Sequence, residues 1–112
     1  MTLQDIIAGL NLKVLTSLRN FNAVTPQGGY ASDLLSCVVA GAQPGNLWIT
    51  LQAHMNVVAV ASLREVSAVI ITENAQPGPE VVEKANDQGV VLLSTERPSY
   101  EIVGKLWEMG VR

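Results

Sequence analysis

The chain has 112 residues, of which 48% are hydrophobic and only 15% are charged, and its formal net charge is −3. Globular domains typically carry about 25% charged residues, and a small domain buries proportionally little of its surface. We therefore expect one domain, residues 1–112, that hides apolar surface by self-association, with a homodimer as the default arrangement.

The distribution of charge and hydropathy argues against nucleic-acid and membrane partners. The seven Lys and Arg residues are scattered along the chain, whereas nucleic-acid-binding proteins gather them on one face. No apolar run reaches the roughly 18 residues of a membrane span, and no basic segment followed by an apolar one marks a secretory signal. These features predict a cytoplasmic protein.

The first quarter of the chain predicts one helix and two weak strands. Thr2 and Asp5 resemble a capping box, with Asp in the usual place of Glu or Gln. The apolar stripe that follows is typical of a helix and consists of Leu3, Ile6, Ile7 and Leu10. Weak alternation in 12–18 and the short segment 20–24 predict strands.

The central stretch is built around two consecutive glycines, Gly28 and Gly29. Such a pair suits a backbone that takes a positive φ or lets another group approach closely. Ser32 as an N-cap and Asp33 in the first turn predict a helix that enters the core. Cys37 lies among the apolar residues of that helix, so we expect a buried, structural thiol.

A phosphate site at the two glycines is the alternative, because helix N-termini bind anions. The chain has neither GxGxxG nor GxxxxGK[ST], and no lysine lies nearby. Asp33 also places negative charge where a phosphate would sit. A closely packed turn is therefore favoured.

The remaining two-thirds alternates strands and helices. Segment 57–63 has no polar face and fits a strand or a helix, but its place between two strands favours a buried crossover helix with Asn56 as N-cap. The last helix is expected to turn Ile102, Val103, Leu106 and Trp107 inward. The expected strands are 47–51, 68–71 and 90–93, and the expected helices are 56–65, 79–88 and 99–108. This order predicts an α/β fold with a mostly parallel sheet between two helical layers.

Polar residues follow the expected strands, and ligands bind open parallel sheets at the carboxyl ends of their strands. Glu96 follows the last strand, and the two glycines are placed provisionally at the same edge. The candidate ligand-binding residues are Gly28, Gly29, His54, Asn56, Thr72, Glu73, Asn74, Ser94 and Thr95.

His54 is the only histidine, which leaves no multi-histidine metal site and no His-paired nucleophile within one chain. It is either a lone acid–base group or a hydrogen-bonded loop residue, and the second interpretation is favoured. We expect no cofactor, no metal and no catalytic constellation.

Four blocks of sequence resemble the DRTGG domain family, and together they extend over nearly the whole chain. The glycines occupy the family's Gly-Gly positions, but Thr25, Pro26 and Gln27 stand where the family name has Asp-Arg-Thr. The blocks are 28–36, Trp48-Ile49-Thr50, 54–61 and Ile70-Ile71-Thr72.

The resemblance implies a three-layer α/β/α fold and a regulatory or assembly role without established catalysis. Family members form regions of phosphotransacetylases and CBS-domain pyrophosphatases, and the domain is similar to the N-terminal domain of HPr kinase/phosphorylase. Kinase activity itself requires a P-loop, which this chain lacks. The leading hypothesis is a non-catalytic regulatory or dimerisation domain with a possible protein partner. The alternatives are a sensor of a small molecule, such as a nucleotide, at the strand ends and a small enzyme that uses His54.

Overall fold

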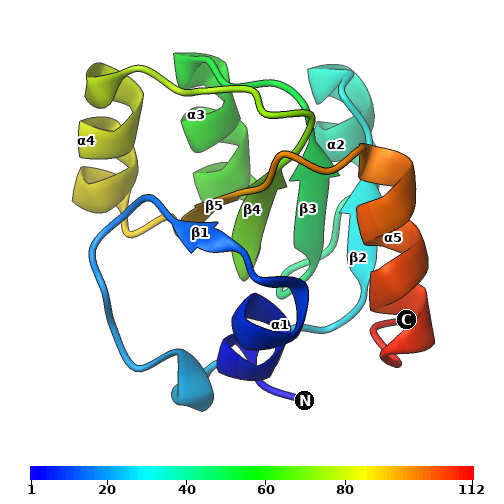
Figure 1. Ribbon diagram of the computed structural model, residues 1–112. Helices are drawn as coiled ribbons and strands as arrows, with labels where there is room; N and C mark the ends of the chain where they lie inside the picture. Colours follow the sequence, from blue (N-terminus) through cyan, green and yellow to red (C-terminus); the bar gives the residue numbers. More distant parts are fainter.

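The apolar runs of the sequence form one five-stranded sheet with helices against both faces, in a computed structural model that describes residues 1–112 (Figure 1). In chain order the elements are α1 (Leu3–Leu10), β1 (Lys13–Val14), the 3₁₀ helix η1 (Phe21–Ala23), β2 (Gly29–Ala31), α2 (Leu35–Gly41), β3 (Leu47–Thr50), α3 (Met55–Arg64), β4 (Ala68–Ile71), α4 (Pro79–Gln88), β5 (Leu92–Ser94) and α5 (Ser99–Glu108). No helix is long and apolar enough to cross a bilayer.

The sheet has the strand order β1-β5-β4-β3-β2. Strands β2 to β5 are parallel neighbours, and β1 pairs with β5 in the antiparallel sense. Every residue of β3, β4 and β5 is buried. Continuous apolar strands of this kind are typical of parallel sheets covered on both sides, which confirms the predicted α/β class and mostly parallel sheet.

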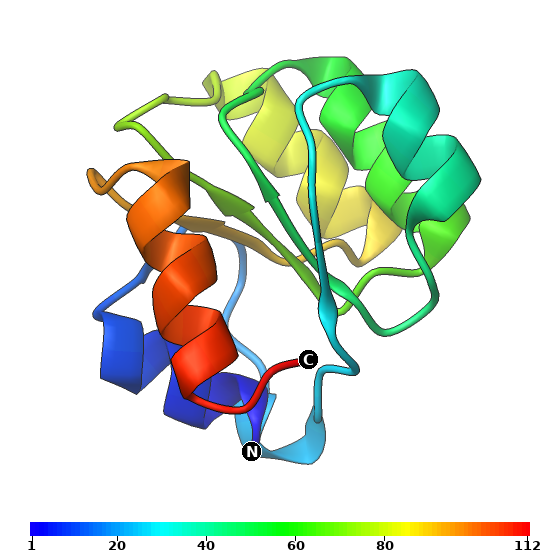
Figure 2. The same cartoon turned by 90° about the vertical axis from the view of Figure 1, so that its right-hand side faces the viewer.

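Two apolar clusters separate the sheet from its helical layers. One contains Ile6 of α1 and Ile102 of α5 packed against Ile70 of β4. The other contains Val38 of α2 and Val58 of α3, among others, on the opposite face. Figure 2 shows α1 and α5 on one side of the sheet and α2, α3 and α4 on the other. The three-layer prediction is therefore confirmed.

Helix ends follow the local signals in the sequence. The Thr2 hydroxyl accepts a hydrogen bond from the Asp5 backbone N–H (3.2 Å), and the Thr2 N–H donates to Asp5 Oδ2 (2.9 Å), which completes the predicted capping box. Pro79 is the first residue of α4, and Gly89 ends that helix with φ +70°. The capping box and the Gly89 N–H satisfy terminal groups of their own helices, and Pro79 has no N–H that would need a partner.

The second glycine of the pair begins a strand, where the sequence predicted a turn into a helix. Gly29–Ala31 forms β2, the edge strand beside β3, and α2 begins only at Leu35. Gly28 has φ +72°, but Gly29 has no positive φ. Ser32 is not the N-cap of α2, and its N–H donates to the Ile49 carbonyl of β3 (3.2 Å).

The α2 helix is less buried than predicted. Val38 is its one buried residue, Cys37 is exposed, and Leu34, which precedes the helix, is 61% exposed. Helix α2 lies at the β2–β3 end of its layer, so α3 is its only helical neighbour (Figure 2). The prediction of a buried thiol at Cys37 was therefore wrong.

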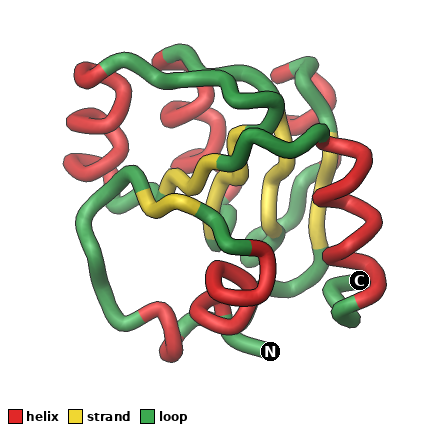
Figure 3. Tube along the Cα trace, in the orientation of Figure 1, coloured by secondary structure: helices red, strands yellow, loops and turns green.

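Two N-terminal strand predictions were largely wrong. Only Lys13–Val14 of segment 12–18 is strand, although Leu15 still donates its N–H to the Leu92 carbonyl (3.0 Å). Segment 20–24 contains the 3₁₀ helix η1. Asn20 accounts for this turn, because its Oδ1 accepts from the Asn22 N–H (3.2 Å) and holds the backbone in a local bend. In Figure 3 this stretch is mostly loop.

The ambiguous segment 57–63 is helical and belongs to α3. The N-cap position is occupied by His54, without a side-chain cap, so the predicted cap at Asn56 was wrong. In α5, Ile102 and Leu106 face the core as predicted, whereas the predicted burial of Val103 and Trp107 was wrong. Val103 is 37% exposed and Trp107 is 59% exposed.

Candidate functional site at the carboxyl edge of the sheet

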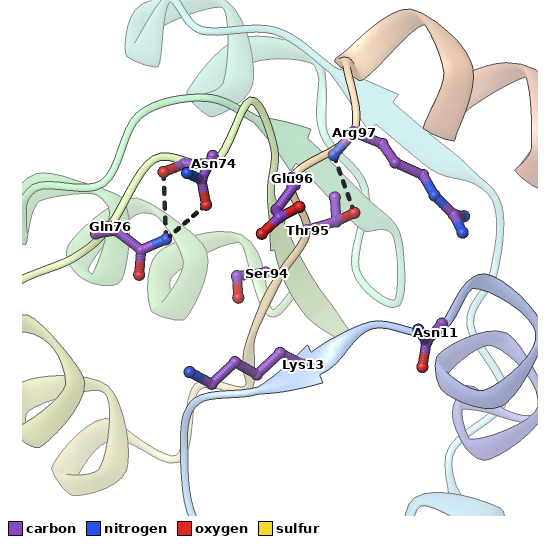
Figure 4. A pocket seen from close by; sticks show the side chains of 8 residues that line it. All are labelled: Asn11, Lys13, Asn74, Gln76, Ser94, Thr95, Glu96 and Arg97. Atoms are coloured by element: carbon purple, nitrogen blue, oxygen red, sulfur yellow. Dashed lines mark hydrogen bonds between the residues drawn. The ribbon is translucent and has the colours of Figure 1, made fainter.

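A polar pocket of about 460 Å³ lies where β4 and β5 end and β1 begins. We call it the carboxyl-edge pocket (Figure 4), and it is lined by Asn11, Lys13, Asn74, Gln76, Ser94, Thr95, Glu96 and Arg97. None of these side chains is hydrophobic. Small-molecule pockets are usually mostly apolar, so this one is suited to a hydrophilic solute.

The course of the chain explains why a pocket forms at this place. The connection after β4 leads to α4 on one face of the sheet, whereas the connection after β5 leads to α5 on the other face (Figure 2). Connections that leave adjacent parallel strands toward opposite faces open a crevice at the carboxyl ends, and open α/β sheets bind ligands there.

Backbone hydrogen bonds tie the two diverging connections together. Glu73 donates its N–H to the Arg97 carbonyl (3.0 Å), and Asn74 donates to the Thr95 carbonyl (3.1 Å). Glu73 and Asn74 both adopt the left-handed region, with φ +60° and +58°. Asn tolerates this conformation well, whereas Glu rarely adopts it. The reversed backbone places the Asn74 side chain on the pocket wall.

Three of the residues predicted from the sequence line this pocket: Asn74, Ser94 and Thr95. Thr72 and Glu73 lie beside it and support it. The buried Thr72 hydroxyl is hydrogen-bonded to the Ser99 hydroxyl and to the Thr50 carbonyl. Glu73 Oε2 accepts from the Ser99 N–H at 2.7 Å, at the start of α5. Both side chains fix the loop geometry.

The other predicted residues lie elsewhere. Gly29 pairs with Leu47, the first residue of β3, so both glycines are at the amino edge of the sheet, and their provisional placement at the carboxyl edge was wrong. A Cβ on Gly28 would lie 3.3 Å from the backbone C and O of Arg112, which fits the close-packing interpretation. His54 is exposed and its side chain makes no hydrogen bond, so the favoured interpretation as a hydrogen-bonded loop residue was wrong. Asn56 is exposed and lines a separate groove between α3 and α4.

Sequence reasoning missed part of the pocket. Asn11 and Lys13 enter it because β1 pairs with β5, with Lys13 opposite Ser94. No local sequence pattern predicts that two strands about 80 residues apart in the chain pair in the antiparallel sense. Gln76 and Arg97 lie close in sequence to predicted site residues. Their polar side chains, shortly after the ends of two strands, could have identified them as site residues.

Arg97 contributes little free charge to the pocket. Its Nη1 donates to the Leu10 carbonyl (3.2 Å), and its Nε lies 3.4 Å from Glu101 Oε2. Figure 4 shows the guanidinium pointing away from Asn74 and Gln76. The side chain therefore links the α5 start to the end of α1.

A second feature is the open edge at β2. The Gly28 carbonyl accepts from the Leu47 N–H (3.0 Å), and the Ser32 N–H donates to the Ile49 carbonyl (3.2 Å). Even-numbered residues thus face β3, which leaves the backbone groups of Gly29 and Ala31 directed outward. Beside them lies a mostly apolar hollow of about 180 Å³, here called the β2 edge groove, lined by Gly29, Tyr30, Ala31, Ile49, Val103, Leu106, Trp107, Val111 and Arg112.

Comparisons with known proteins agree with this architecture. The family model for the DRTGG domain matches residues 31–109, which begins just after the glycine pair. No curated protein matches the chain. Among solved structures, the chain is similar to the CBS and DRTGG domains of the regulatory region of Clostridium perfringens pyrophosphatase, which was crystallised with its activator diadenosine tetraphosphate.

That similarity has a TM-score of 0.74 at 19% sequence identity, and it covers 91% of this chain. The chain spans 46% of the pyrophosphatase region, and the likeness shows a shared fold. The family match over most of the sequence, on that fold, shows that the protein belongs to the DRTGG domain family.

Proposed function

We propose that this protein is a non-catalytic regulatory domain that works through self-association at the β2 edge. The observation that carries the proposal is the open backbone of β2 beside the apolar β2 edge groove. Edge strands with free N–H and C=O groups pair readily with other strands unless they are protected. Here the outward residues Gly29 and Ala31 carry no bulky or charged side chain that would block pairing.

Two copies related by a two-fold axis would pair β2 with its counterpart and join the sheets. Val103 and Trp107 of α5 flank this edge with exposed apolar surface, which the partner copy would cover. A two-fold interface uses the same patch on both subunits. The low charged fraction of 15% is consistent with burial of further surface. The similar part of the pyrophosphatase is its regulatory region, which agrees with a role of this class.

Light scattering tests the proposal at micromolar protein concentration. We expect twice the chain mass of 12.0 kDa, and we expect Ala31→Lys to give the single chain mass, because an edge lysine opposes strand pairing. Leu63→Lys is the matched control, since Leu63 is 64% exposed on α3, in the other helical layer. A monomer of the unsubstituted chain at every concentration contradicts the proposal, as does a dimer that Ala31→Lys leaves intact.

The carboxyl-edge pocket favours a second function, the sensing of a small ligand. Eight polar residues from three separate segments converge there without an apolar neighbour. A ligand at 100 times its Kd would stabilise the fold by about 2.7 kcal/mol. A thermal-shift screen of hydrophilic metabolites measures this effect. Asn74→Ala should reduce the shift, whereas His54→Ala should not, because His54 is outside the pocket. The absence of a shift for every compound contradicts this function.

A further inference from the structure

We propose that the carboxyl-edge pocket binds a small zwitterion of the amino-acid type with a polar side chain. The inference rests on the ligand-sensing function proposed above and adds the chemical class of the ligand. It follows from the charges, the uncommitted hydrogen-bonding groups and the absence of apolar lining in the pocket.

The pocket holds one uncommitted cation and one uncommitted anion. Lys13 comes from β1 and Glu96 from the β5–α5 connection, and both are exposed. The only ion pair of the structure joins Arg97 to Glu101, so the Lys13 ammonium and the Glu96 carboxylate are not paired with each other. A ligand that carries both a carboxylate and an ammonium satisfies both side chains at once, through charge-assisted hydrogen bonds.

Neutral groups surround these charges. Ser94 is 6% exposed, lines the pocket, and its hydroxyl makes no hydrogen bond within the chain. Gln76 Nε2 donates to Asn74 Oδ1 (3.1 Å), which leaves Gln76 Oε1 and Asn74 Nδ2 available. Figure 4 shows these amides on the side of the pocket opposite Lys13. One hydroxyl, one amide donor and one amide acceptor suit a polar ligand side chain.

The same lining opposes other ligand classes. A nucleobase is normally held by stacking on aromatic or apolar side chains, and the pocket has none. Inorganic phosphate would meet the Glu96 carboxylate, while Lys13 would be its one free cation. A neutral sugar would leave both charges unpaired, and the pocket offers it no aromatic platform. A zwitterion pairs with both free charges of the lining, Lys13 and Glu96.

Chemical-shift mapping on the ¹⁵N-labelled full chain tests the inference with L-serine and L-glutamine as probes. We expect one of these amino acids, at millimolar concentration, to shift the amide signals of Lys13, Ser94 and Glu96. Lys13→Gln and Glu96→Gln should each weaken binding about tenfold, the usual effect of losing one hydrogen bond to a charged group. Lys84→Gln and Glu83→Gln, on exposed positions of α4 outside the pocket, are the matched controls and should leave affinity unchanged.

Blocked probes separate the zwitterion from its parts. N-acetylserine lacks the ammonium, and serine amide lacks the carboxylate. If L-serine binds more tightly than L-glutamine, both blocked forms should bind at least tenfold more weakly than L-serine. If L-glutamine is the tighter ligand, its N-acetyl and amide forms replace them as probes. Equal binding of a blocked form overturns the proposal. If the amide signals of the pocket shift with inorganic phosphate, glucose or AMP but with neither amino acid, the zwitterion proposal is also wrong. The proposed sensing function is then retained. No response to any probe, here and in the thermal screen, contradicts both. The light-scattering result is independent of all three outcomes.

Discussion

Asp33 Oδ1 accepts two hydrogen bonds from the end of β3, one from the Thr50 hydroxyl (2.8 Å) and one from the Leu51 N–H (2.8 Å). Thr50 is completely buried. Asp33 was predicted to lie in the first turn of a helix, but it precedes α2 and fastens the β2–α2 connection to the carboxyl end of β3. The edge strand is therefore held at both ends by contacts with β3.

Asp33→Ala should lower the free energy of unfolding by about 1–3 kcal/mol, because it leaves the buried Thr50 hydroxyl and the Leu51 N–H without their acceptor. Asp33→Asn retains an oxygen at the same position and should cost much less. Urea denaturation of the two variants measures the difference. Equal stability of Asp33→Ala and the unsubstituted chain would show that water replaces the carboxylate at no cost.

Gly28 and Gly29 should respond differently to alanine. Gly28→Ala forces a side chain into φ +72° and places its Cβ 3.3 Å from the Arg112 backbone, so we expect a loss of about 1–2 kcal/mol. At Gly29 the nearest atom would be the Leu47 carbonyl oxygen at 3.4 Å, an ordinary contact in an extended strand. Chemical denaturation of Gly28→Ala and Gly29→Ala measures the two losses in the free energy of unfolding. A larger loss at Gly29 than at Gly28 would contradict the backbone conformations described above.

Glu73→Ala should fray the start of α5. Pro98 occupies the N-cap of this helix without a side-chain hydrogen bond, and Glu73 supplies the missing acceptor from another loop. We expect a loss of about 0.5–2 kcal/mol, the usual effect of removing a cap. Hydrogen exchange should become faster at the Ser99 amide. Glu73→Gln keeps an acceptor and serves as the control; if it exchanges as fast as Glu73→Ala, the carboxylate charge is what holds the helix end.

Asp5 should make folding stability depend on acidic pH. The Thr2 N–H, together with the Thr2 hydroxyl, holds the pKa of Asp5 below its ordinary value. A depressed pKa in the folded state adds stability above the unfolded pKa of about 3.9, and this stability is lost as the pH falls through the lower folded value. Asp5→Asn should therefore show a flatter stability profile below about pH 4. Asp87→Asn, at an exposed aspartate of α4, is the control. If Asp87→Asn flattens the pH dependence of stability equally, the effect does not come from the capping box.

Local signals in the sequence determined most of the element order. The Thr2–Asp5 box, Pro79 and Gly89 mark helix ends because their hydrogen bonds and backbone angles involve only neighbouring residues. The runs 47–51, 68–71 and 90–93 are apolar without alternation, which is enough to predict strands buried on both faces. The same order places Thr72, Asn74 and Ser94 at one edge of the sheet.

Contacts between distant segments determined the edge strand at β2, the exposure of Trp107 and the place of Lys13 in the pocket. Hydrogen bonds to β3 hold the residues after Gly28 in an edge strand, although the local sequence favours a turn. Trp107 carries a core-type side chain but lies over the small residues of β2, so much of it stays exposed. Lys13 joins Ser94 only because β1 closes the far edge of the sheet. Whether a side chain is buried or lines a pocket depends on which segments pack against each other. The residue pattern within one segment predicts only the backbone conformation of that segment.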